Sequence, residues 1–174
     1  MEQTKIKIII ADDNKKICDM INDYLINEKD MDIIGIANNG VDALKLIQEK
    51  KPDLVILDMI MPQLDGLEVL TRLKTLDLDP MPHIVVLSAV SNDKISQRAI
   101  SLGAGYYVLK PFDMEVLVKR IRLVVNKTMY SDDVKSFSYI HNTESKTEEI
   151  QSVHMIAQIT NIIQKIGIPA HIKG

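Results

Sequence analysis

Residues 54–58 read Leu-Val-Ile-Leu-Asp, an apolar run of strand length that ends in a carboxylate. An earlier run, residues 5–11, is followed directly by Asp12 and Asp13. The carboxyl ends of parallel strands meet at one edge of an open α/β sheet, so these two acids and Asp58 are expected to gather there. Three carboxylates within about 4 Å of one another repel by several kcal/mol, and such a cluster needs a cation or a raised pKa. The sequence therefore predicts a site for a divalent metal that prefers oxygen ligands.

Runs of this kind alternate with helix-periodic stretches through residue 128. The runs are rich in Ile and Val and show too little polar alternation for a sheet with one wet face, so we expect strands buried on both faces. Strands are expected at residues 5–11, 31–37, 54–58, 83–88 and 106–110. Helical spacing relates the apolar residues that follow each strand: Ile17, Ile21, Tyr24 and Leu25; Val41, Leu44 and Ile47; Leu67, Leu70 and Leu73; Ile95, Ala99 and Leu102; Leu117, Ile121 and Val124. Five β-α units predict an α/β fold with a doubly wound parallel sheet.

Composition narrows the class of protein. The 174 residues are 46% hydrophobic and carry a net charge of −3, which suits one globular domain with an appendage. No part has the basic excess that would by itself indicate nucleic-acid binding. The single cysteine, Cys18, excludes an intramolecular disulfide and fits a reducing compartment. No signal-type stretch or membrane-length apolar run is present, so we expect a cytoplasmic protein without membrane contact.

Two more polar side chains end strands at the same edge, Ser88 on the fourth and Lys110 on the fifth. Asp58 could bind a metal through one oxygen and attack a phosphoryl group with the other, giving an aspartyl-phosphate. Mg²⁺ would screen the repulsion, while Lys110 and Ser88 would pair with the phosphoryl oxygens. Each residue also has an ordinary interpretation: Asp13 or Asn14 could cap the first helix, Lys110 could be a solvated lysine and Ser88 a turn residue.

The segments around these residues closely resemble the receiver domains of two-component response regulators: residues 10–13 (Ile-Ala-Asp-Asp), 57–66 (Leu-Asp-Met-Ile-Met-Pro-Gln-Leu-Asp-Gly), 87–89 (Leu-Ser-Ala) and 103–112 (Gly-Ala-Gly-Tyr-Tyr-Val-Leu-Lys-Pro-Phe). The resemblance covers about residues 4–128. It implies a flavodoxin-like fold with five helices and strand order 2-1-3-4-5. It also implies a partner, either a histidine kinase or a histidine phosphotransfer protein.

The resemblance implies a role for each acid. Asp58 would accept the phosphoryl group from the partner's histidine. Asp12 and Asp13 would hold Mg²⁺ directly or through water, and the backbone carbonyl of Ile60 would be a further ligand. The chain would transfer phosphate to itself and turn over no external substrate, so it is not expected to be an enzyme.

The remaining residues of the motif would form the switch. Ser88 would supply the switch hydroxyl, Lys110 would contact the phosphoryl group, and Tyr107 would be the aromatic side chain that turns inward on activation. The bond between Lys110 and Pro111 would be cis. Phosphorylation would rearrange the surface formed by the fourth helix, fifth strand and fifth helix and promote a homodimer.

The pattern changes after the receiver-like part, which we place at residues 1–128. Residues 129–147 are polar and aperiodic and are expected to be a linker. A capping box of Ser145 with Glu148 then precedes an apolar helical stripe that ends at Gly167 and Pro169. Residues 160–174 resemble the start of the DNA-binding domain of the master sporulation transcription factors of endospore-forming Firmicutes, the stage 0 sporulation protein A type. Residues 148–174 would be an incomplete stub of that helical domain, although periodicity alone also allows a helix that packs on the receiver.

The resemblance separates two expectations about output. A full-length relative would bind DNA and control transcription. Residues 1–174 contain no groove-reading helix or basic tail, so this fragment is not expected to bind DNA specifically. The main alternative is a stand-alone receiver that acts as a phosphorelay intermediate.

Other classes of protein fit less well. A phosphatase of the haloacid-dehalogenase type normally has a second acid two residues after the nucleophile, where this chain has Ile60. A flavin-binding module would need a Ser/Thr-rich phosphate loop in place of Asp12 and Asp13. The glycine-lysine motif of P-loop nucleotide-binding proteins is absent from the sequence.

Overall fold

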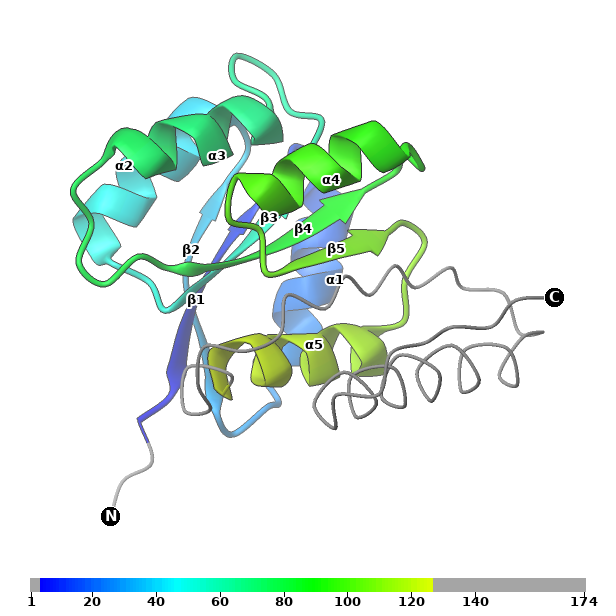
Figure 1. Ribbon diagram of the computed structural model, residues 1–174. Coiled ribbons are helices and arrows are strands. Elements are labelled where there is room, and N and C mark those ends of the chain that lie inside the picture. Colours follow the sequence, from blue (N-terminus) through cyan, green and yellow to red (C-terminus); the bar gives the residue numbers. More distant parts are fainter. Residues whose placement is uncertain (1–3, 127–174) are drawn as a thin grey trace, which may run out of the picture. The chain divides into compact units, whose positions relative to one another are not determined.

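Strands form at the Ile- and Val-rich runs of the sequence. In the computed structural model, which describes residues 4–126, they are β1 (Ile6–Ala11), β2 (Met31–Ala37), β3 (Leu54–Asp58), β4 (His83–Ser88) and β5 (Tyr106–Leu109). All neighbouring strands pair in parallel, in the order β2-β1-β3-β4-β5 (Figure 1). The predicted flavodoxin-like sheet is confirmed. The bounds differ only by one residue at the start of β1 and at the end of β5.

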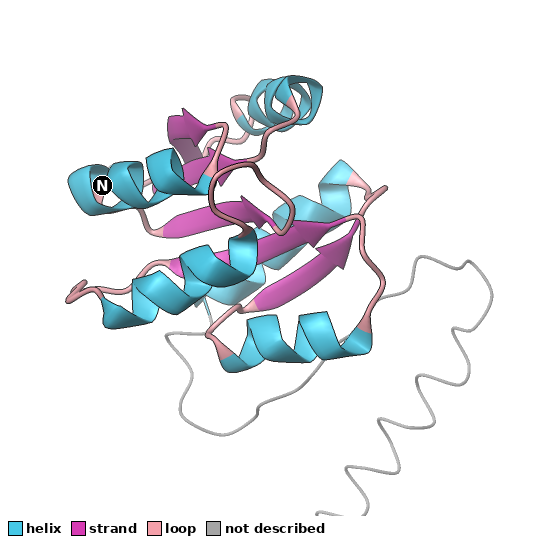
Figure 2. Cartoon of the chain, turned by 90° about the horizontal axis from the view of Figure 1, so that it is seen from above, coloured by secondary structure: helices cyan, strands magenta, loops and turns pink. Residues whose placement is uncertain are grey.

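Helices cover both faces of this sheet. They are α1 (Lys15–Leu25), α2 (Gly40–Lys50), α3 (Gly66–Thr75), α4 (Asp93–Ser101) and α5 (Met114–Asn126). Helices α2, α3 and α4 lie on one face and α1 and α5 on the other (Figure 1). In the view from above, helices lie in front of and behind the strands (Figure 2). The first four helices begin with capping side chains that accept from an amide of the first turn: Asn14, Asn39, Asp65 and Asn92.

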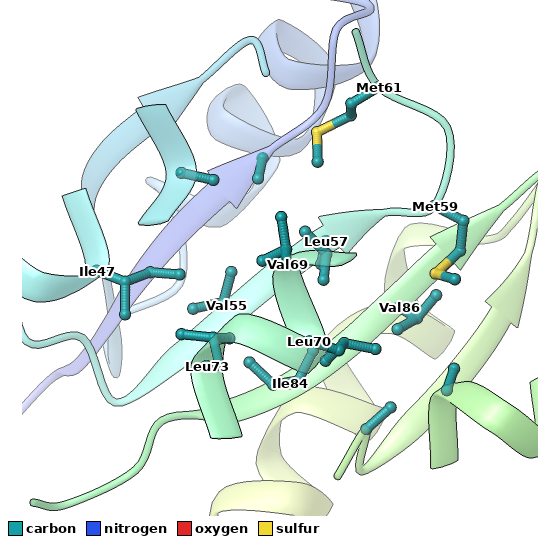
Figure 3. Close-up of a cluster of buried hydrophobic side chains, with 14 of the residues drawn as sticks. Ile47, Val55, Leu57, Met59, Met61, Val69, Leu70, Leu73, Ile84 and Val86 are labelled. Carbon is teal, nitrogen blue, oxygen red and sulfur yellow. The ribbon is translucent and has the colours of Figure 1, made fainter. Parts of the chain in front are cut away.

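The core consists of two layers because successive residues of a strand point to opposite faces. Residues 55 and 57 of β3 pack with α2, α3 and α4, whereas residues 54 and 56 pack with α1 and α5. Strands β1 and β4 divide in the same way. Figure 3 shows the first layer, in which α2 and α3 press apolar side chains onto β3 and β4. This two-sided burial explains why the strands lack polar alternation.

The expected apolar stripe of α2 was wrong at one position. Val41 is 47% exposed, and the helix instead buries Gly40, Ala43 and Ile47. Two of these three residues are small, so the start of α2 approaches its neighbours closely. Hydrophobic periodicity favours large side chains and gives no signal for a face of this kind.

The expected linker at 129–147 and the expected stub at 148–174 lie outside the described residues. Among the helices between residues 4 and 126, none is both long and apolar enough to cross a membrane.

Candidate functional site

Three carboxylates meet at the carboxyl edge of the sheet. Asp12 and Asp13 follow β1 and Asp58 ends β3, and one oxygen from each lies within 4.8 Å of the others. Asp12 and Asp58 are buried, whereas Asp13 is exposed. A set of carboxylate oxygens, partly open to solvent, is the donor set that Mg²⁺ uses in proteins. The predicted gathering of the three acids is confirmed, and the residues present fit a hard divalent cation.

The loop between β1 and α1 holds Asp12 in place. Its Oδ1 accepts from the amide of Asn14 at 2.8 Å, and its backbone carbonyl accepts from the thiol of Cys18 at 3.3 Å. Asn14 caps α1, with its side chain accepting from the Lys16 amide at 3.0 Å. The cap of α1 is therefore Asn14 and not Asp13, and Asp65 caps the helix that follows Asp58.

Lys110 lies among the acids and is not a solvated lysine. Its Nζ donates to Asp12 Oδ2 at 2.7 Å and lies 3.3 Å from Asp58 Oδ1, and its side chain is only 16% exposed. The backbone amide of Lys110 donates to the carbonyl of Ser88 at 2.8 Å, so the pairing of β4 with β5 reaches the site itself. The bond to Pro111 is cis, as expected.

The cluster carries more negative than positive charge. Burial, and next the charge of Asp12, raise the pKa of Asp58, against the opposing effects of Lys110 and the Ile60 amide. Burial favours the neutral amine of Lys110, but its hydrogen bond to Asp12 and the charges of Asp58 and Asp12 prevail and raise its pKa. The one ammonium group therefore pairs with two of the three carboxyl groups, and a bound divalent cation would relieve the remaining repulsion.

Ser88 and Tyr107 are linked through the backbone of a residue that the sequence did not single out. Ser88 Oγ accepts from the amide of Val90 at 3.0 Å, and the Tyr107 hydroxyl donates to the carbonyl of Val90 at 3.0 Å. Ser88 is fully buried, and Tyr107 lies inward with 9% of its surface exposed. The inward turn of Tyr107 on activation stays a prediction. Val90 acts through its peptide groups, so no side-chain pattern could have indicated it.

The loop after Asp58 brings Ile60 next to the acceptor. The backbone amide of Ile60 lies near enough to the Asp58 carboxyl to lower its pKa slightly, and the Ile60 side chain is 58% exposed. The neighbouring Met59 and Met61 are buried in the core layer shown in Figure 3. Cation binding by the Ile60 carbonyl stays a prediction.

Comparison with known proteins agrees with this geometry. The family model of the response regulator receiver domain matches residues 8–122. Solved structures with 30% sequence identity include a DNA-binding response regulator of the LuxR family from Staphylococcus aureus, with a TM-score of 0.64 and coverage of 70% of this chain and 99% of that chain.

Two further structures are similar at the same 30% identity. The receiver domain of AraT, a response regulator from Geobacillus stearothermophilus, has a TM-score of 0.62 and covers 71% of this chain and 95% of its own. The BeF3-activated N-terminal receiver domain of RstA from Klebsiella pneumoniae has a TM-score of 0.61, with coverage of 68% and 97%.

Proposed function

The chain belongs to the response regulator receiver family, and we propose that Asp58 accepts a phosphoryl group with Mg²⁺ bound beside it. Receiver domains are phosphorylated by histidine kinases or histidine phosphotransfer proteins, and a protein of one of these kinds is the proposed partner. The observation that carries the proposal is the contact of buried Asp58 with Lys110, within a cluster that also contains Asp12 and Asp13.

The chemistry follows from these positions. An oxygen of Asp58 forms the new bond to phosphorus while the bond from phosphorus to the donor's histidine nitrogen breaks, and the electron pair of that bond stays on the imidazole. Mg²⁺, when bound, screens the charge of the phosphoryl oxygens. Asp12 and Asp13 would hold the cation, with the Ile60 carbonyl as a further ligand. Lys110, already at Asp58, would donate a second hydrogen bond to a phosphoryl oxygen.

We also propose that phosphorylation operates a switch. The Ser88 hydroxyl accepts from Val90 through its oxygen, so its own proton can be donated to a phosphoryl oxygen. That contact would draw the chain after β4 toward Asp58, and the Val90 carbonyl would carry the shift to Tyr107. To change the population from about 1:99 to 99:1, the phosphoryl group must favour the active state by about 5.5 kcal/mol. A few charge-assisted hydrogen bonds in a shielded site could supply this.

The proposed output is a homodimer formed through the surface of α4, β5 and α5. That dimer would control transcription, and the resemblance of residues 160–174 supports a role in the initiation of sporulation. We propose that the protein is cytoplasmic and turns over no external substrate. In this division, residues 1–128 are the receiver, residues 129–147 the linker, and residues 148–174 belong to an effector domain.

Size-exclusion chromatography before and after treatment with a small phosphodonor and Mg²⁺ tests this proposal. Wild-type protein should shift to the dimer position only when both reagents are present. Lys110→Ala should still be labelled but stay monomeric, because its phosphoryl group lacks the hydrogen bond from the Lys110 ammonium group that helps to operate the switch. A labelled wild-type protein that stays monomeric would favour the stand-alone relay, which returns its phosphoryl group to a histidine phosphotransfer protein.

A further inference from the structure

The loop from Met59 to Asp65 follows the acceptor directly and is attached at both ends. The amide of Met59 donates to the carbonyl of Leu87 at 3.2 Å, and the amide of Gly66 donates to the carbonyl of Met59 at 3.0 Å. A Cβ atom at Gly66 would lie 2.5 Å from the carbonyl oxygen of Asp58, so α3 begins against the backbone of the acceptor. Because the loop is short and fixed at both ends, a shift of one of its residues should also move the others.

The middle of the loop rests on the start of α2. Leu64 is 8% exposed, and its amide donates to the Pro62 carbonyl at 2.8 Å. A Cβ atom at Gly40, the first residue of α2, would overlap the carbonyl oxygen of Leu64 and lie 2.7 Å from its Cβ and 2.9 Å from its carbonyl carbon. Two of these three atoms belong to the backbone, so no rotation of the Leu64 side chain could make room.

We propose that Gly40 is a positioning residue for the cation site. Because Gly40 has no side chain, α2 packs closely on Leu64 and fixes the position of the loop that carries the Ile60 carbonyl. This inference rests on the proposed binding of Mg²⁺ by Asp12, Asp13 and Asp58. Helices α2 and α3 lie side by side in Figure 1. The loop from Met59 to Asp65 leads directly into α3. A methyl group at position 40 must increase the separation between the Leu64 backbone and α2.

The displacement is large on the scale that the cation tolerates. Ordinary contacts between carbon atoms are about 3.5–4.0 Å, so the Leu64 backbone or α2 must move by about 1 Å. Mg²⁺ demands nearly ideal octahedral geometry at about 2.0–2.1 Å from its ligands. A misplacement of about 1 Å can cost a factor of about 100 in a catalytic site, and we expect Gly40→Ala to weaken Mg²⁺ binding at least about tenfold.

The experiment is a calorimetric titration of the full chain with Mg²⁺ alone, together with hydrogen exchange of the Gly66 amide in metal-free protein. Gly103→Ala is the matched control. Gly103 has a φ of +106° and nothing within 4 Å of its Cβ position, so an alanine there strains the backbone without meeting a neighbour. It precedes β5, at the edge of the sheet opposite the acids.

We expect Gly40→Ala to bind Mg²⁺ at least about tenfold more weakly and to exchange the Gly66 amide at least about tenfold faster, because the loop opens locally. Gly103→Ala should match wild type in both measurements despite its lower stability. Wild-type values for Gly40→Ala would overturn the inference, and a wild-type protein that binds no Mg²⁺ would instead contradict the proposed function.

If Gly40→Ala does not fold, Leu64→Ala tests the same contact from the loop side. This variant keeps the backbone but removes most of the side chain that holds the loop in the core layer. Weaker Mg²⁺ binding and faster Gly66 exchange in folded Leu64→Ala would support the inference, and wild-type behaviour in both would overturn it.

Discussion

Replacing Lys110 by methionine should destabilise the protein strongly in the absence of metal, because it leaves two buried carboxyl groups without their cation. At an effective dielectric constant of about 20, the attraction of Nζ is roughly 6 kcal/mol for an oxygen at 2.7 Å and roughly 5 kcal/mol for one at 3.3 Å. Much of this is offset by the desolvation of the ammonium group. Removal of one partner from a buried pair costs about 3–5 kcal/mol, and the 16% exposure of Lys110 places it near 3 kcal/mol.

The loss should depend on pH and on metal. The pKa of Asp58 is higher in the folded protein than its ordinary value. Between these two pKa values the folded protein holds a proton that the unfolded chain has released. The free energy of unfolding therefore falls as pH rises through this range. Without Lys110 that pKa rises further. The deficit of Lys110→Met relative to wild type should therefore be largest near neutral pH and shrink as pH falls.

Urea unfolding, followed by circular dichroism between pH 5 and 8, measures this deficit. Lys119→Met, at an exposed lysine of α5, is the matched control and should change stability by less than about 0.5 kcal/mol. Mg²⁺ at about 100 times its dissociation constant should return about 2–3 kcal/mol to Lys110→Met. A deficit below about 1 kcal/mol, or one that is independent of both pH and Mg²⁺, would refute the charge account of the site.

Two predictions concern residues outside the cluster. Arg122→Gln should cost about 1 kcal/mol at neutral pH, because partly exposed Arg122 bonds Asp30 at 2.8 and 2.9 Å and Glu28 at 2.6 Å. The hydrogen bond to Arg122 lowers the pKa of Asp30 below its ordinary 3.8. The stabilisation by this pair is therefore present above pH 3.8 and should disappear as acid protonates Asp30. A difference in urea midpoint between Arg122→Gln and wild type that persists in acid would argue against this. Cys18 is buried, and burial raises the pKa of its thiol to about 11. A disulfide reagent at pH 8 should therefore modify Cys18 no faster than the protein unfolds. Rapid modification of the native protein would show that the thiol is accessible.

The sheet and the site were largely predictable because their determinants are local and repeated. Each strand is a run of branched apolar residues that ends in a polar one, and parallel pairing brings Asp12, Asp58, Ser88 and Lys110 to one edge whatever the details of the helices. The burial of β3 on both faces could be predicted from the absence of alternating polar and apolar residues alone.

The contacts within the site were not predictable, because they depend on how close backbone segments come. Val41 was expected in the core, but the face of α2 that packs is the one that carries Gly40. Val90 contributes only peptide groups, and the thiol of Cys18 donates to a carbonyl across a helix start.

Peptide-level mass spectrometry after incubation with a small phosphodonor shows whether Asp58 is the phosphoryl acceptor of a Mg²⁺-dependent receiver. One phosphoryl group should appear on the peptide that contains Asp58, only when Mg²⁺ is present, and Asp58→Asn should remain unlabelled. Labelling of Asp58→Asn at the wild-type level, or a phosphoryl group mapped to Asp12 or Asp13, would show that Asp58 is not the acceptor.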